Sequence, residues 1–232
     1  MYRRLLALQR DCSETLRSHR VRLTGSLDRD LAIVRACVAP MLSGIATMAP
    51  ALVVEQARHM LEDPASADAM LLEGWHALSG HQFFPKVVLQ PYAQCLAASG
   101  VRPVDRDPPQ SRYACPFCGG PPQLSILENA AGADGGGRQL MCATCFTVWP
   151  FGRVLCAHCG EDDEHRLGYF HAPPFEHLRV DSCDTCKHYL KTVDLTRLGR
   201  AVPVVDEVAG AALDLWAVEH GYQKIELNLI GL

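Results

Sequence analysis

Eight of the eleven cysteines in the sequence stand in four C-x-x-C pairs, all of them after residue 114. The pairs are Cys115/Cys118, Cys142/Cys145, Cys156/Cys159 and Cys183/Cys186. Two residues between cysteines allow both sulfurs to face one ion, and four thiolates around one ion make a closed tetrahedral site. The spacing therefore predicts two mononuclear metal ions, each held by four cysteines.

The cysteine pairs repeat along the chain with an offset of 41 residues. Shifting the first two pairs by this offset places them on the last two, and it also places Gly119 on Gly160 and Arg138 on Arg179. Such a repeat indicates an internal duplication, and each copy is expected to close its own site. The expected sets are Cys115, Cys118, Cys142 and Cys145, then Cys156, Cys159, Cys183 and Cys186. The glycine after each first pair suits a turn with positive φ.

The spacing leaves the metal open, because four thiolates suit zinc and a single iron equally well. The segment Cys115-Pro116-Phe117-Cys118-Gly119 looks like the metal-binding loop of rubredoxin, which holds one iron. His158 is expected to be a solvent-facing loop residue rather than a fifth ligand. A thioredoxin-like dithiol is disfavoured, because no convincing helix follows any of the pairs. The isolated Cys12, Cys37 and Cys95 are expected to be small buried core residues.

The elements that must position these cysteines differ before and after residue 112. Apolar spacing predicts an N-terminal helix through Leu5 and Leu16, a second capped by Ser26, and further helices over 51–62, 66–79 and 85–98. Short strand-like runs follow over 123–128, 138–141, 148–154 and 167–170, and a helix is expected over 206–220.

The predicted fold class is α+β, with an all-helical domain followed by two tandem rubredoxin-like or zinc-ribbon-like β modules and a C-terminal helix. We expect the helical domain over 1–100, a linker over 101–112, the first metal module over 113–152, the second over 153–200, and the C-terminal helix and tail over 201–232. The expected linker contains three prolines among polar residues.

The uncharged run from Ala36 to Val54 has about the length of a membrane span. Pro40 and Pro50 are expected to break it into two buried helices, so no membrane insertion is predicted. The opening Met-Tyr-Arg-Arg does not look like a signal peptide. A reducing cytoplasm is therefore the expected compartment, and in it C-x-x-C pairs indicate metal or dithiol chemistry.

Charge and missing motifs exclude several classes of function. The formal net charge is −4, and because residues 1–22 carry +4 the remainder carries −8, which disfavours binding of nucleic acid. We find no phosphate-binding G-x-x-x-x-G-K-[ST], no H-E-x-x-H and no G-x-S-x-G. Closed four-thiolate sites also leave no open position for a substrate, so an enzyme is not expected.

The arrangement of motifs resembles the formate dehydrogenase accessory protein family, FdhE. The resemblance lies in C-P-x-C-G, in the second pair followed by Trp149 and Arg153, in the third pair followed by Gly160, and in Cys183-Asp184-Thr185-Cys186 followed by Tyr189-Leu190-Lys191. It also includes Leu213-Asp214-Leu215, Gly221-Tyr222, Asn228 and Gly231 near the end. It is close over residues 112–232 and looser over the helices.

Two departures from the family pattern stand out. The N-terminal region is expected to lack a leading segment, and Lys187-His188 replaces an expected small residue such as glycine followed by threonine. The resemblance implies a cytoplasmic protein with two rubredoxin-like metal folds, iron being the metal usually associated. It also implies a factor needed for active formate dehydrogenase, which binds that enzyme's catalytic subunit before export.

Two other functions fit the cysteine spacing, namely a zinc-ribbon adaptor for nucleic acid or transcription and a rubredoxin-like electron carrier. The oligomeric state stays open. Phe117, Phe146 and Phe151 lie near the cysteines and are candidates either for a partner surface or for local packing around the metal.

Overall fold

The computed structural model describes residues 2–77, 83–107, 109, 111–129 and 137–231. By their Cα packing the residues divide into two units. The helical unit contains Met1–Pro109 with Phe117–Gly119, and the cysteine unit contains Gln110–Pro116 with Gly120–Leu232. The domain boundaries expected from the sequence, at 100, 112, 152 and 200, remain a prediction.

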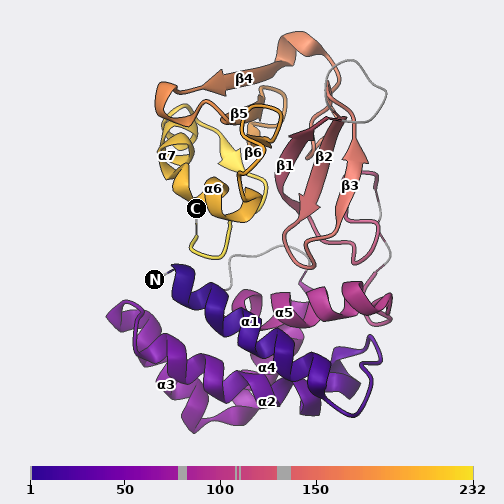
Figure 1. Ribbon diagram of the computed structural model, residues 1–232, viewed down its shortest axis with the longest axis vertical. Coiled ribbons are helices and arrows are strands. Elements are labelled where there is room, and N and C mark those ends of the chain that lie inside the picture. The colour runs from indigo at the N-terminus through magenta and orange to yellow at the C-terminus, as the bar shows by residue number, and fades with distance from the viewer. Residues whose placement is uncertain (1, 78–82, 108, 110, 130–136, 232) are drawn as a thin grey trace. The chain divides into compact units, whose positions relative to one another are not determined.

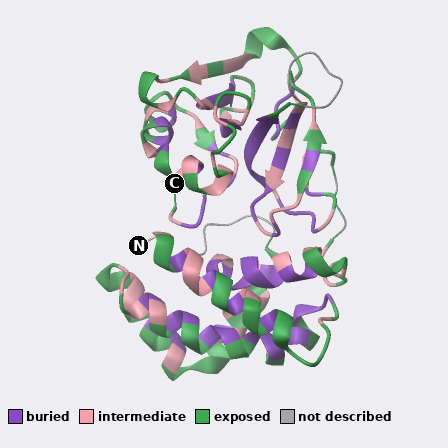
Figure 2. Ribbon diagram, viewed as in Figure 1, coloured by how far each residue is buried: buried purple, intermediate pink, exposed green. Residues whose placement is uncertain are grey.

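Five helices make up the described part of the helical unit (Figure 1). They are α1 (Tyr2–Ser18), α2 (Leu27–Ala46), α3 (Ala51–Glu62), α4 (Pro64–His76) and α5 (Phe83–Ser99). The stripe that α1 buries contains Leu5, Gln9, Cys12 and Leu16, the helical spacing of an amphipathic helix whose polar side faces water (Figure 2). The helix expected over 66–79 starts two residues earlier, and residues 78 and 79 lie outside the described ones.

The expectation that Pro40 ends a helix is wrong, because α2 continues through it to Ala46. Pro40 lies on the exposed side of the helix, while Met41, Leu42 and Ile45 beyond it are almost fully buried. A proline inside a helix costs about 3 kcal/mol, whereas burying each large apolar side chain contributes about 1.5–3 kcal/mol. Continuing the helix is therefore favoured. Among the described residues, no helix has the length and apolar character needed to cross a membrane.

Two carboxylates, the buried Asp30 and the half-buried Asp105, hold the loops of the helical unit by hydrogen bonds. Asp30 accepts hydrogen bonds from the backbone N–H of Thr24 at 2.9 Å and of Gly25 at 3.2 Å, and from the hydroxyl of Tyr92 at 2.8 Å. Asp105 accepts from the indole N–H of Trp75 at 2.8 Å and from the backbone N–H of Leu27. The first part of the segment expected to be a linker is thus hydrogen-bonded to the helices.

The cysteine unit contains one sheet rather than two separate small ones. Its strands are β1 (Pro122–Glu128), β2 (Gly137–Cys142), β3 (Val148–Phe151), β4 (Leu167–His171), β5 (Leu178–Cys183), β6 (His188–Asp194) and β7 (Gln223–Lys224). Two 3-10 turns, η1 (Glu164–Arg166) and η2 (Pro173–Phe175), flank β4. The order across the sheet is β3-β2-β1-β6-β5-β4, with β7 also paired to β6.

The duplication read from the cysteines is also present in the strands. Shifting β2 by 41 residues gives β5 with the same bounds, and shifting β3 places it inside β6. Within each copy the strands pair antiparallel, β1 with β2 with β3, and β4 with β5 with β6. The copies join where β1 pairs in parallel with β6, from Leu124 opposite Lys191 to Leu127 opposite Asp194. They are therefore arranged head to tail.

A buried polar network fills the junction between the copies. The Ser125 hydroxyl on β1 hydrogen-bonds the Thr192 hydroxyl on β6, and the Arg138 guanidinium on β2 lies 3.0 Å from the carboxylate of Asp181 on β5. Thr192 donates to the same carboxylate at 2.7 Å. Arg138 also donates to the carbonyl of Leu155, between the copies, at 2.8 Å. The side chains of Arg138 and Asp181 are 3% and 8% exposed, so this ion pair is shielded from water.

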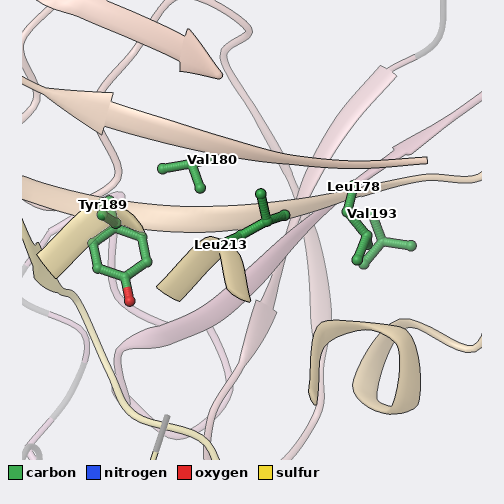
Figure 3. Packing of buried hydrophobic residues seen from close by; sticks show 6 residues of the cluster. Leu178, Val180, Tyr189, Val193 and Leu213 are labelled. Atoms are coloured by element: carbon green, nitrogen blue, oxygen red, sulfur yellow. The ribbon is translucent and has the colours of Figure 1, made fainter. Parts of the chain in front are cut away.

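Two C-terminal helices follow the sheet, α6 (Pro203–Ala209) and α7 (Ala211–Glu219), and the second copy has an apolar core to which α7 contributes. Leu178 and Val193 lie opposite each other on β5 and β6, and Leu213 reaches this core from α7 (Figure 3). The prediction of a single helix over 206–220 is wrong, because Gly210 separates α6 from α7. A Cβ at Gly210 would lie 2.7 Å from Leu178, so glycine lets the helix corner approach the sheet closely.

A cluster of buried charges joins these helices to β6 and β7. The Lys191 ammonium lies 3.1 Å from Glu207 and also pairs with Asp214, while the Lys224 ammonium lies 3.1 Å from Asp214 and also pairs with Glu207. The amide of Asn228 donates to Glu207 at 2.8 Å. Burial lowers the pKa of Lys191. Two ammonium groups and two carboxylates balance in charge, which makes their burial tolerable.

Candidate metal centres

The first cysteine set comes together between the start of β1 and the β2–β3 turn. Cys115 and Cys118 precede β1, Cys142 ends β2, and Cys145 lies in the turn before β3. The four sulfurs all lie within 4.8 Å of one another, and all four residues are buried. The sulfurs of Cys115 and Cys145 are 3.6 Å apart.

The second set repeats this arrangement on β4 to β6. Cys156 and Cys159 precede β4, Cys183 ends β5, and Cys186 lies in the turn before β6. Their sulfurs again lie within 4.8 Å of one another, with 3.7 Å between Cys156 and Cys186 and 3.7 Å between Cys159 and Cys183. The structure therefore groups the eight cysteines as the duplication predicts. No sulfur is shared between the two sets.

Backbone conformation builds both loops in the same way. The N–H of Cys115 donates to Gly120 at 2.9 Å, and that of Cys156 donates to Glu161 at 2.8 Å, which closes each loop after its first pair. Gly119 and Gly160 have φ of 74° and 79°, which confirms the expected turn. The second pairs are followed by Phe146 and Lys187, with φ of 59° and 57°. This left-handed conformation favours glycine and explains why a small residue was expected at position 187.

The donor sets fit a tetrahedral metal ion. With metal–sulfur bonds of 2.3 Å, the sulfurs at the corners of a tetrahedron are about 3.8 Å apart, close to the 3.6–3.7 Å seen here. A disulfide would bring two sulfurs to about 2.05 Å, and none of the eight cysteines forms one. The spacing therefore suits ligands around an ion and not disulfide bonds.

Backbone N–H groups point at the sulfurs and favour the thiolate form. Thr144 donates to Cys142 Sγ at 3.3 Å, and His158 and Cys159 donate to Cys156 Sγ at 3.4 and 3.5 Å. In the absence of a metal, burial raises the pKa of the Cys186 thiol. An ion binding there must therefore displace a proton, so uptake of metal releases protons.

The two clusters differ in their exposure to solvent. Every cysteine of the first set is buried, whereas Cys159 is exposed and Cys186 is half-buried in the second. His158 is exposed, as expected, but its ring stacks on that of His188 with 3.7 Å between centroids and 10° between planes. Partial desolvation of the stacked ring, and then the nearby His188, lower the pKa of His158.

The remaining cysteines lie in the helical unit, and the three phenylalanines near the clusters are partly shielded from solvent. Cys12, Cys37 and Cys95 are buried in the helical unit, as expected, and burial raises the pKa of Cys95. Phe151 makes an edge contact with Tyr113 at 6.1 Å, which favours local packing for this ring. Phe117, Phe146 and Phe151 are all half-buried.

Sequence reasoning missed the residues that join the copies. Arg138 and Arg179 occupy equivalent positions of the repeat. In the structure both guanidinium groups contact the carboxylate of Asp181, with nitrogen–oxygen distances of 3.0 and 2.6 Å. Two arginines at equivalent positions of a repeat are a signal that could have pointed to a shared carboxylate. The stacking of His158 on His188 had no such signal, because it joins two loops.

Comparison with known proteins gives matches over both the cysteine unit and the whole fold. Residues 114–153 match the family model described as "FdhE, central domain", and residues 154–230 match "FdhE, C-terminal domain", together half of the chain. A "Protein FdhE homolog" of Aquifex aeolicus is 36% identical over 117 residues, which cover 50% of this chain and 41% of the relative. A "Protein FdhE homolog" of Pseudomonas aeruginosa is 35% identical over 127 residues, covering 52% of this chain and 40% of the relative.

These aligned regions span about two fifths of the curated relatives. A solved structure, "The crystal structure of the FdhE protein from Pseudomonas aeruginosa", matches with a TM-score of 0.71 and 23% identity, covering 97% of this chain and 85% of that one. At this identity the likeness establishes the fold.

Proposed function

The chain belongs to the FdhE family, and from this premise we propose that it is an accessory factor needed for an active formate dehydrogenase. In this proposal it binds the catalytic subunit of that enzyme in the cytoplasm before export. The observation that carries the proposal is the pair of four-cysteine clusters on a duplicated scaffold, found in the part of the chain that matches the family.

We further propose that each cluster holds one metal ion, with iron rather than zinc as the resident metal. The ligands are Cys115, Cys118, Cys142 and Cys145 in the first centre and Cys156, Cys159, Cys183 and Cys186 in the second. An iron held by four thiolates supplies one-electron chemistry, whereas zinc in the same site is structural. The sulfur–sulfur distances support a mononuclear site and are compatible with both metals.

The proposed role is that of a binding protein and not an enzyme. Four thiolates complete the coordination of each ion, so neither centre keeps a position open for substrate. Recognition of a polypeptide then falls to the protein surface around the centres and on the helices.

An electron carrier is a second candidate, supported by the exposure of Cys159. A thiolate at the surface brings a bound iron close to a redox partner, whereas the first centre is buried. Colour and redox titration of the purified protein test this candidate, because ferric thiolate sites are red, whereas a zinc protein is colourless and shows no redox transition.

The decisive experiment combines a deletion strain with purification of complexes. Removing the gene is expected to reduce formate dehydrogenase activity while transcripts of the enzyme's genes stay at their normal level. The tagged chain is expected to retain the catalytic subunit and to oxidise no formate itself. Normal enzyme activity in the deletion strain, or retention of DNA or RNA at physiological salt, would contradict the proposal and favour a zinc-ribbon adaptor.

A further inference from the structure

A third group of metal-binding side chains lies at the rim of the second centre. The ligating atoms of His158, Cys186 and His188 all lie within 4.8 Å of one another. His158 comes from the loop before β4, Cys186 lies in the turn before β6, and His188 is the first residue of β6. We call these three residues the rim cluster.

The hydrogen bonding of His188 prepares it as a ligand. Its Nδ1 lies 2.8 Å from the backbone carbonyl of Cys186, and because a carbonyl only accepts, Nδ1 carries the proton. Nε2 then keeps its lone pair. Histidines that bind metals usually donate their other ring N–H to a carbonyl or carboxylate in this way, which fixes the ring and its tautomer.

We propose that the rim cluster is a third metal-binding position, selective for a borderline divalent transition metal such as Zn²⁺ or Co²⁺. Two imidazole nitrogens and a thiolate suit such ions. Cys186 serves both positions, since a thiolate sulfur has further lone pairs with which to bridge two ions. The inference rests on the proposed second centre, whose Cys186 is half-buried and therefore reachable from solvent.

One ring must turn slightly for both histidines to bind one ion, and the surroundings of His158 permit it. Stacked parallel rings direct their lone pairs alongside each other, whereas bonds of about 2.0–2.1 Å to one ion require the nitrogens to converge. His158 is exposed, so its ring can turn without disturbing packed neighbours. His188 stays fixed by its carbonyl contact.

The duplication supplies an internal comparison. The counterparts of His158 and His188 at an offset of 41 residues are Phe117 and Thr147, a pair without an imidazole. The first cluster is also fully buried. The cysteine ligands thus repeat while the rim does not, so the third position belongs to the second copy alone.

Titration of the metal-loaded chain with Co²⁺ tests the proposal. We expect a third equivalent to bind, with a thiolate charge-transfer band from Cys186, while the two resident ions stay in place. The double variant His158→Phe and His188→Thr gives the second rim the residues of the first. It should keep two ions and bind the third at least tenfold more weakly. His171→Gln, an exposed histidine outside the cluster, serves as the matched control.

If the double variant loses resident metal, the single variant His158→Phe carries the test, because this side chain is exposed. A loaded protein that binds no third Co²⁺, or one whose third ion is unaffected by the histidine variants, would overturn the rim position and leave the two centres standing. A chain that purifies without ions in its cysteine clusters would contradict the two centres themselves.

Discussion

Each cysteine contributes to one cluster only, so the two centres should lose metal separately. Cys115→Ser removes one thiolate from the first set and leaves all sulfurs of the second. We expect the metal content to fall from two ions per chain toward one, and Cys156→Ser to do the same at the other centre. Elemental analysis of the purified variants measures this.

The combined variant should hold no ion. Loss of both ions from Cys115→Ser alone, or one ion in the unaltered chain, would contradict separate centres.

Lys187 occupies a backbone conformation that costs an L-residue about 1–2 kcal/mol. Its ammonium pairs with Asp184, but both side chains are about half exposed, and surface pairs contribute about 0–1 kcal/mol. Lys187→Gly is therefore expected to stabilise the metal-loaded protein by about 1 kcal/mol, measured as a shift in the urea unfolding midpoint.

Lys187→Ala is the matched control, since it removes the ion pair and keeps the left-handed conformation. It should leave the midpoint unchanged or lower it. A glycine variant no more stable than the alanine variant would show that the positive φ carries no cost here.

At the scale of elements, Arg138 links the two copies across the junction of β1 and β6, because it contacts Ser125 on β1 and Asp181 on β5. Replacing it by methionine keeps the length of the side chain but leaves Asp181 with one buried partner fewer. Breaking a buried ion pair in this way costs about 3–5 kcal/mol. Denaturant unfolding followed by a probe in the cysteine unit should show this loss in Arg138→Met.

Arg179→Met is the natural comparison, because Arg179 occupies the equivalent position of the repeat and contacts the same carboxylate. Its side chain is 17% exposed against 3% for Arg138, so a smaller loss is expected. Equal losses in the two variants would argue against a special role for the junction.

The helical unit should respond to alkaline pH through Tyr92. Burial, and then the hydrogen bond to Asp30, raise the pKa of Tyr92 above its unfolded value of about 10. A group whose pKa is raised by folding contributes its full stabilisation below the unfolded pKa and loses it as the pH rises above that value. Tyr92→Phe should cost about 1 kcal/mol at neutral pH, and the difference from the unaltered protein should shrink above about pH 10.

Urea unfolding of both proteins across this pH range measures the difference. Tyr169→Phe is a control at an exposed ring and should show a smaller dependence on pH. A difference that stays constant with pH would mean that the hydroxyl of Tyr92 ionises as easily in the folded chain as in the unfolded one.

The cysteine sets could be predicted because the pattern that defines them is local in the sequence. The joining of the two copies could not be predicted in this way. C-x-x-C spacing and the following glycine act within a few residues, and the 41-residue offset assigned the pairs correctly. The effects of Pro40 and Gly210 on their helices were predicted wrongly, because both depend on tertiary packing. Helix α2 continues through Pro40 to bury Met41, and the break at Gly210 lets the chain approach Leu178. The parallel pairing of β1 with β6 joins residues more than sixty positions apart, which no local pattern encodes.

At the scale of the whole molecule, metal removal should affect the two units differently. If the ions contribute folding energy, chelation should loosen residues 113–200 and leave the helices of the helical unit in place. Limited proteolysis after chelation is expected to cut first within the cysteine unit, with mass spectrometry locating the sites. Equal protection with and without metal would mean that the apolar core around Leu178 and Leu213 is sufficient by itself.

The buried charge cluster also sets an order of events during synthesis on the ribosome. Glu207 acquires its partners Lys224 and Asn228 only after these residues have been added, and β7 cannot pair with β6 before then. At the usual 5–20 residues per second, the second cysteine set emerges roughly 2–8 s before the chain that completes its sheet. The three strands and four cysteines of the first copy do not pair with β7 and have all been synthesised by Phe151, so the nascent chain contains a complete first cysteine set beside an unfinished second copy.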